Sequence, residues 1–453
     1  MGNQWWATGC NGLDVAATNY LPITGQMTSS SDSTTEAEVQ SVISEAGTLK
    51  RMVITLSAAP GTDNSYAFKI YKNGVGTALT VTISGTSTTG TIAADVTVAA
   101  GDRLSIEYIP TSTPTTSNAD IWIEFQPTTA NNFTYPCGFG VTQISAAPQH
   151  CGLLSGSAAS GAPGTDSEAT RSVSPIAGTI TKFYVKVATA PGAGKSWTFE
   201  ILVNGVEDAT AEVIIGETDT AVNVTDLAIA VAAGDYLTFQ LKTETGVATA
   251  TRAMSAAVTF VPTTPGQFAI CTQADSGGTS TVAAFYGFYG KADVSVDYNG
   301  TETAVQRTVP TKLRAKALYA RITTAPGASG DTYTFRSRVG AGNGNISFTI
   351  VDAATTGGAA GTDNYNAGNL IDIGITPSGP SPAAIGNSNF GIALEVPAGG
   401  GGGGGGQGGQ GGGGGKPPSG GGGGGPGGGG PPGQQKRMVV GNRRLRRRGL
   451  ALL

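Results

Sequence analysis

Charged and aromatic residues are scarce in this chain. Of its 453 residues, 13% are Asp, Glu, Lys or Arg and 7% are aromatic. Amphipathic helices need charged residues on one face at a period of about 3.6 residues, and stretches that combine Leu, Glu, Lys and Arg at that spacing are absent. The surplus of Gly, Ala, Thr and Ser instead favours antiparallel strands with one face in solvent. The composition therefore predicts an all-β protein.

Histidine and cysteine are also rare. The chain has one histidine, His150, and four cysteines, Cys10, Cys137, Cys151 and Cys271. A single histidine excludes metal sites built from several imidazoles, and the cysteine spacings match no zinc pattern. We expect buried thiols, although a disulfide between Cys137 and Cys151 stays open, and a histidine on the surface or in a loop. No glycine-rich string has the lysine and hydroxyl of a P-loop, and no local set of residues supports catalysis. We therefore predict no metal, no cofactor and no catalytic residue.

Long apolar runs are missing as well. No segment is apolar over the length that a bilayer requires, and the start MGNQWWATGC lacks the cationic residues and apolar stretch of a secretory signal. We therefore expect neither membrane insertion nor export by the general secretory route.

What the sequence does contain is a repeat. The strings SAAPGTDNSYAFKIYKNGV, ATAPGAGKSWTFEILVNGV and TTAPGASGDTYTFRSRVGAG begin at residues 57, 188 and 323, and their prolines lie 131 and 135 residues apart. A unit of roughly 130 residues can bury a core by itself, unlike solenoid repeats of roughly 20 to 50 residues. We expect three tandem domains at residues 1–130, 131–265 and 266–398, each with its own apolar interior.

Strand patterns recur at matching places in the three copies. Alternate residues are apolar before each proline, an aromatic-X-Phe string follows it, and a second alternating stripe begins at AAGDRLSIEY, AAGDYLTFQL and NAGNLIDIGI. Asn-Gly at 73–74 and 204–205 predicts tight hairpins, because both residues tolerate positive φ. About eight short strands per unit predict an antiparallel sandwich. The predicted core positions are Met52, Ile54, Leu56, Phe183, Val185, Val187, Leu318, Ala320, Ile322, Leu104, Ile106, Tyr108, Leu237, Phe239, Leu241, Ile371, Ile373 and Ile375.

The V-x-x-G-D-x-L rhythm of VAAGDRLSI and VAAGDYLTF resembles the penultimate strand of jelly rolls of the tumour-necrosis-factor and complement type. The resemblance implies jelly-roll strand order. Because modules of that family associate as trimers, three tandem copies imply a one-chain pseudo-trimer. The Ala/Thr/Gly-rich repeats with APG-x-G-x-x-aromatic-T-F strings are also similar to repeats in structural proteins of tailed-phage particles.

Charge is divided unevenly along the chain. Residues 1–398 contain 19 basic and 31 acidic residues, a net charge of −12, whereas the rest contains eight basic residues and no acid. Residues 399–435 are mainly glycine and predict a flexible linker. Residues 436–453 form a basic tail that we expect to contact nucleic acid or another anionic surface, or to lie against the acidic body. The candidate contact residues are Lys436, Arg437, Arg443, Arg444, Arg446, Arg447 and Arg448.

Together these features predict a non-enzymatic structural protein of a phage virion, a head-decoration or fibre component. Its partners would be other virion proteins or copies of itself, and it would be assembled in the host cytoplasm and located in the virion. One alternative is a bacterial cell-surface or fibre-forming adhesin, extracellular or on the cell surface, that binds surface glycans through sandwich loops. Trp5, Trp6, Trp122 and Trp197 are candidate stacking platforms for a sugar. Another is a carbohydrate-active enzyme whose carboxylates come from distant strands.

Overall fold

The computed structural model describes residues 3–28, 32–144, 149–154, 171–242, 250–274, 283–288, 300–327, 330–386 and 388–397. These residues are built from strands and connecting loops, and the helical elements among them are short 3-10 turns. The turns are η1 (Glu36–Glu38), η2 (Ala209–Ala211) and η3 (Glu302–Ala304). None of the described helical segments is long and apolar enough to cross a bilayer. The predicted all-β class is confirmed.

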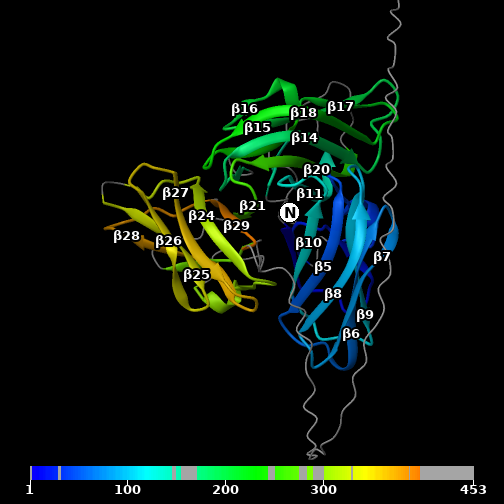
Figure 1. The fold of residues 1–453 in the computed structure, drawn as a ribbon, viewed down its shortest axis with the longest axis horizontal. Coiled ribbons are helices and arrows are strands. Elements are labelled where there is room, and N and C mark those ends of the chain that lie inside the picture. Colours follow the sequence, from blue (N-terminus) through cyan, green and yellow to red (C-terminus); the bar gives the residue numbers. More distant parts are fainter. Residues whose placement is uncertain are drawn as a thin grey trace, which may run out of the picture. The chain divides into compact units, whose positions relative to one another are not determined.

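The first repeat folds as two sheets with strand orders β3-β1-β10-β5-β8 and β2-β9-β6-β7, and β4 pairs with β9 (Figure 1). The strands are β1 (Gln4–Asn11), β2 (Asn19–Leu21), β3 (Gly25–Thr28), β4 (Ser41–Val42), β5 (Gly47–Leu56), β6 (Gly61–Lys72), β7 (Val75–Gly85), β8 (Thr89–Val98), β9 (Arg103–Thr111) and β10 (Ala119–Pro127).

The second repeat has sheets of order β11-β20-β14-β18 and β12-β19-β15-β16, with β13 on β19 and β17 on β15. The strands are β11 (Phe133–Ile144), β12 (Gln149–Gly152), β13 (Ser172–Val173), β14 (Gly178–Val187), β15 (Ser196–Val203), β16 (Val206–Glu207), β17 (Val213–Gly216), β18 (Ala221–Val231), β19 (Tyr236–Leu241) and β20 (Ala250–Pro262).

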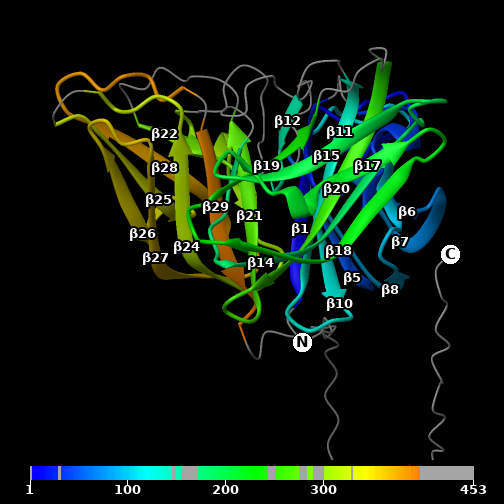
Figure 2. The same cartoon turned by 90° about the horizontal axis from the view of Figure 1, so that it is seen from above.

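The third repeat has sheets of order β21-β29-β24-β27 and β22-β28-β25-β26, with β23 on β28 (Figure 2). The strands are β21 (Gln267–Ala274), β22 (Ala284–Tyr286), β23 (Arg307–Thr308), β24 (Leu313–Ile322), β25 (Thr332–Val339), β26 (Gly342–Val351), β27 (Thr356–Tyr365), β28 (Leu370–Ser378) and β29 (Ser388–Glu395).

Eight strands of each repeat follow one order. When these eight strands are lettered B to I along the chain, the first sheet has the order B-I-D-G and the second sheet has the order C-H-E-F. This is the double Greek key of the jelly roll, so we call these the BIDG sheet and the CHEF sheet. The expected strand order is confirmed in all three repeats, while the residue limits of the three domains stay a prediction.

The predicted stripes face the interior of each sandwich. All eighteen predicted core residues are buried, with exposed fractions of 3% or less. The Asn-Gly pairs form the expected hairpins, since φ is 53° and 83° at Asn73 and Gly74 and 54° and 78° at Asn204 and Gly205. Sequence alternation therefore located the core correctly.

The outer face of the BIDG sheets differs from the expectation. All of β1 except Asn11, and all of β29 except Glu395, is buried on both faces. The buried apolar residues of the second and third repeats form one continuous cluster, which Trp5 and Trp122 join from the outer face of the first repeat. The first repeat keeps a separate interior. The prediction of one solvated face and three separate cores is thus wrong for these sheets, because another repeat covers them.

The covering segment is the same one in each repeat, the short strand β4, β13 or β23 with the loop after it. The amide of Val42 donates to Ser255 Oγ in the second repeat at 3.2 Å. The carbonyl of Val173 accepts from Cys271 Sγ in the third repeat at 3.3 Å. Arg307 pairs with Asp120 in the first repeat. Contacts therefore run from first to second, second to third and third back to first, as a one-chain pseudo-trimer requires.

Two details support this cyclic arrangement. Gln4, Phe133 and Phe268 hold equivalent places in the register of β1, β11 and β21, and all three line one small hollow. At Gly391 a Cβ would lie 2.4 Å from the carbonyl oxygen of Val173. Glycine at that position lets β13 approach the sheet of the third repeat closely.

Candidate functional site

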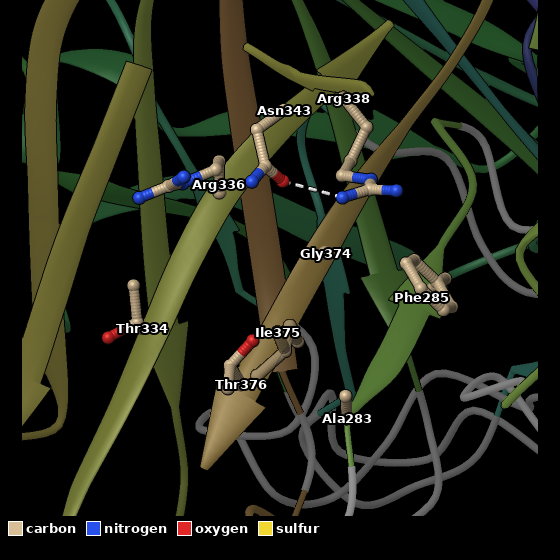
Figure 3. Close-up of a pocket in the computed structure, with 9 residues that line it drawn as sticks. All are labelled: Ala283, Phe285, Thr334, Arg336, Arg338, Asn343, Gly374, Ile375 and Thr376. Carbon is tan, nitrogen blue, oxygen red and sulfur yellow. Dashed lines mark hydrogen bonds between the residues drawn. The ribbon is translucent and has the colours of Figure 1, made fainter. Parts of the chain in front are cut away.

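A candidate binding site lies on the outer face of the third CHEF sheet. It is a hollow of about 440 Å³ between β22, β25, β26 and β28 (Figure 3). Its lining combines two guanidinium groups, hydroxyls, an amide and one aromatic ring. The lining residues are Ala283, Phe285, Thr334, Arg336, Arg338, Asn343, Gly374, Ile375 and Thr376.

The hollow exists because its floor has no side chain. Phe285, Gly374 and Arg336 lie side by side in register across β22, β28 and β25. A Cβ on Gly374 would meet only the side chains of Arg338, at 3.2 Å, and Phe285, at 3.8 Å. None of these atoms belongs to the backbone, and a side chain at 374 would need Arg338 to shift by a few tenths of an ångström.

The other two repeats fill this place with their own side chains. In the first repeat the register places Glu107 between Tyr20 and Lys69. The Glu107 carboxylate accepts hydrogen bonds from the hydroxyls of Tyr20, at 3.2 Å, and Tyr71, at 3.0 Å. In the second repeat Gln240 occupies the position. The third repeat alone has glycine there, and it replaces Lys69 and Tyr71 by Arg336 and Arg338.

Arg338 is held rigidly at one side of the hollow. Its Nε and Nη2 donate to the two carboxylate oxygens of Glu302 on η3, at 2.7 and 2.8 Å. Its Nη1 donates to the amide oxygen of Asn343 (Figure 3), and its guanidinium carbon lies 5.2 Å from the centre of the Phe285 ring. The bidentate contact fixes the guanidinium plane.

Arg336 has a different environment. Its side chain extends away from both Arg338 and Gly374 (Figure 3), and it makes no ion pair with any residue in the described part of the chain. Its positive charge is therefore not balanced by a carboxylate of this face, and a negatively charged group in the hollow would gain from it.

One buried acid adjoins the hollow. Asp372 precedes Gly374 by two residues on β28, so both lie on the same face, and Asp372 Oδ1 lies 4.0 Å from Arg338 Nε. Burial, and then the negative charge of Glu302, raise the pKa of Asp372 to about 7. The charge of the cluster around Arg338 therefore changes near neutral pH.

A second cavity of about 300 Å³ lies where the first repeat meets the second. It is lined by Arg103 and by Lys186, whose Nζ donates to Gln40 Oε1 at 2.9 Å. Burial, and then the charge of Arg103, lower the pKa of Lys186 to about 8. This cavity lies between the two repeats, and Arg103 and Lys186 make its lining cationic.

The residues that the sequence singled out have different outcomes. All four cysteines are buried thiols, and no disulfide joins Cys137 to Cys151. The prediction for His150 is wrong: it lies in β12, the edge strand of its sheet, and is only 8% exposed. The residues Lys436, Arg437, Arg443, Arg444, Arg446, Arg447 and Arg448 lie outside the described residues, as does the 399–435 linker, and their role stays a prediction.

The tryptophans do not form the stacking platform that one alternative required. Trp5, Trp6, Trp122 and Trp197 are 1 to 4% exposed. Trp6 instead stacks on Phe125, with ring centroids 4.7 Å apart. Within the described residues no group of three or more His, Cys, Asp or Glu is placed to hold a metal ion.

Sequence reasoning missed the hollow, although the signal was present. Aligning the copies places Gly374 opposite Glu107 and Gln240, and an unmatched glycine inside a strand marks a place where a side chain has been removed. Its meaning depends on the residues beside it on β22 and β25, and only the sheet register brings those together.

No family model matches this chain, and no curated protein matches it. Among solved structures, a chain from Sulfolobus Turreted Icosahedral Virus is 10% identical, with 78% of this chain and 79% of that chain covered and a TM-score of 0.16. A second, from a study of the triple jelly roll fold and turret assembly in an archaeal virus, is 9% identical, with the same coverage and a TM-score of 0.14. Such scores do not establish a shared fold, so the jelly-roll assignment rests on this chain's own strand order.

Proposed function

We propose that this chain is a structural protein of a virus particle, in which its partners are other virion proteins or further copies of itself. The observation that carries the proposal is the cycle of contacts among three jelly rolls of one strand order. A single chain that closes this cycle presents three related jelly rolls as one unit, and such a unit suits repeated packing.

The surface of the described residues fits a role in contact rather than catalysis. The third CHEF face carries a hollow without a nucleophile and base, and the buried acids Glu200 and Asp372 lie within ion-pair distance of Lys242 and Arg338. The basic tail would add an attachment to nucleic acid or another anionic surface, whose strength would fall as salt rises. Within the particle we place the protein on the outside, as a head decoration or fibre component of a phage assembled in the host cytoplasm.

The test is mass spectrometry of purified particles. The proposal expects peptides of this chain at a constant ratio to the major capsid protein across independent preparations. Particles that are infectious and contain none of its peptides would overturn it. Salt-washed particles provide a second arm, because a decoration held by the basic tail should be released as ionic strength rises.

A further inference from the structure

We propose that the hollow on the third CHEF sheet binds an acidic sugar, with the sugar carboxylate taking the place that the Glu107 side chain fills in the first repeat. The inference is independent of the virion proposal, because it depends on one sheet of one repeat.

The first and third repeats differ at this position. In the first repeat a carboxylate of the chain itself sits in this position and accepts two hydrogen bonds at 3.2 and 3.0 Å. In the third repeat the carboxylate is missing at Gly374, and the neighbouring positions have become more cationic, with Arg336 and Arg338 in place of Lys69 and Tyr71. The site therefore offers donors and charge for a carboxylate that it does not itself contain.

The two arginines of the hollow differ in how far carboxylates neutralise them. Glu302 neutralises Arg338 through two hydrogen bonds, whereas Arg336 makes no ion pair with a described residue. Below a pH of about 7, where Asp372 is protonated, a net positive charge thus remains on this face. Hydrogen bonds between a guanidinium group and a carboxylate are among the stronger polar contacts in proteins, and Arg336 is the group that we assign to the ligand carboxylate.

The remaining wall of the hollow combines polar and apolar groups. Thr334, Thr376 and Asn343 supply hydroxyl and amide groups, which can both donate and accept. Phe285 supplies one apolar wall. A volume of about 440 Å³ lies in the range of small-molecule sites. Hydroxyls on a compact ring with one carboxylate match this lining better than a simple inorganic anion, which would leave most of the hollow empty.

The experiment uses the full chain and three probes: glucuronate, glucose and acetate. Glucose is the neutral analogue of glucuronate, and acetate carries the carboxylate without the sugar. Titration calorimetry and saturation-transfer NMR should show glucuronate binding at least about tenfold more tightly than either control. Glucose lacks the carboxylate contacts, and acetate lacks the contacts of the sugar ring. Equal binding of glucuronate and glucose, or of glucuronate and acetate, would overturn the proposal.

Three variants connect the binding to this site. Gly374→Glu restores the carboxylate of the first repeat, and the atoms nearest to a Cβ there belong to the Arg338 and Phe285 side chains and not to the backbone, so it should fold and lose glucuronate binding. Arg336→Gln should weaken binding about tenfold or more. Lys69→Gln, at the matching position of the first repeat, is the control and should bind as the wild type does. Binding that survives both Gly374→Glu and Arg336→Gln would place the sugar elsewhere and refute the assignment.

Discussion

At the scale of single residues, two glycines show how closely the repeats are matched. A Cβ on Gly47 would lie 2.3 Å from the Phe125 ring, and one on Gly178 would lie 2.1 Å from the Phe260 ring. In the third repeat both members change together, to Leu313 and Leu394. Glycine against phenylalanine and leucine against leucine are two ways of filling the same volume.

The change Gly47→Ala should therefore destabilise the protein by about 1 to 3 kcal/mol, because the methyl group would overlap a packed ring and a backbone carbonyl. Trp6 stacks on Phe125, so urea unfolding followed by tryptophan fluorescence reports on this site. Gly216→Ala is the matched control: a Cβ there meets nothing within 4 Å. An unfolding midpoint that is lowered equally by both changes would contradict the packing described here.

Asp372 gives a prediction for pH dependence. Its pKa is about 7 in the folded protein, against an ordinary value of 3.8. Between these values the folded state keeps a proton that the unfolded state has lost, so this contribution to stability is complete below pH 4 and is lost as pH rises to about 7. The loss is about 4 kcal/mol at most.

Urea unfolding followed by circular dichroism at pH 5 and pH 8 measures the part of this loss that falls between those values, about 3 kcal/mol, and Asp372→Asn should reduce it. Asp95→Asn is the control, since Asp95 pairs with Lys50 at the surface with 70% of its side chain exposed. If the variant at 372 retained the full pH dependence of the wild type, Asp372 would not be its source.

At the scale of elements, sequence alternation predicted the strands that have one face in the core. It identified the aromatic-X-Phe strands and the stripes of β9, β19 and β28, because these follow a period of two. The hairpins were identified by their Asn-Gly turns. It did not predict that β1 and β29 are buried on both sides. The signal is the near-continuous apolar and small residues of WWATGC and NFGIALE, which is typical of strands covered on two faces. Which segment covers them is set by contacts between distant parts of the chain.

The contact of β23 with the first repeat can be tested at Arg307. Its side chain is 4% exposed, that of its partner Asp120 is 15% exposed, and burial lowers the pKa of Arg307 to about 9. Asp120→Ala should cost about 3 kcal/mol, because it removes a carboxylate that offsets a buried charge. Hydrogen exchange of β1 and β23 should accelerate in this variant and stay unchanged in Asp95→Ala. Equal exchange in both variants would show that the pair does not hold the two repeats together.

At the scale of the whole molecule, the sequence predicted three similar units and implied, through the jelly-roll resemblance, that they associate as a trimer does. The structure shows how the repeats contact one another: one short strand of each repeat lies on the outer BIDG face of another. The hollow at Gly374 depends on the opposite process, the divergence of the repeats. Packing keeps the shared positions alike, whereas the exposed CHEF faces have been free to differ, as Glu107, Gln240 and Gly374 illustrate.

The most direct test of this account is an experimental structure of the full chain by crystallography or cryo-electron microscopy. We predict the same jelly-roll order in all three repeats, with the Val42 amide at Ser255, the Val173 carbonyl at Cys271 and Arg307 at Asp120. A repeat with a different strand order, or a third repeat that does not touch the first, would contradict it.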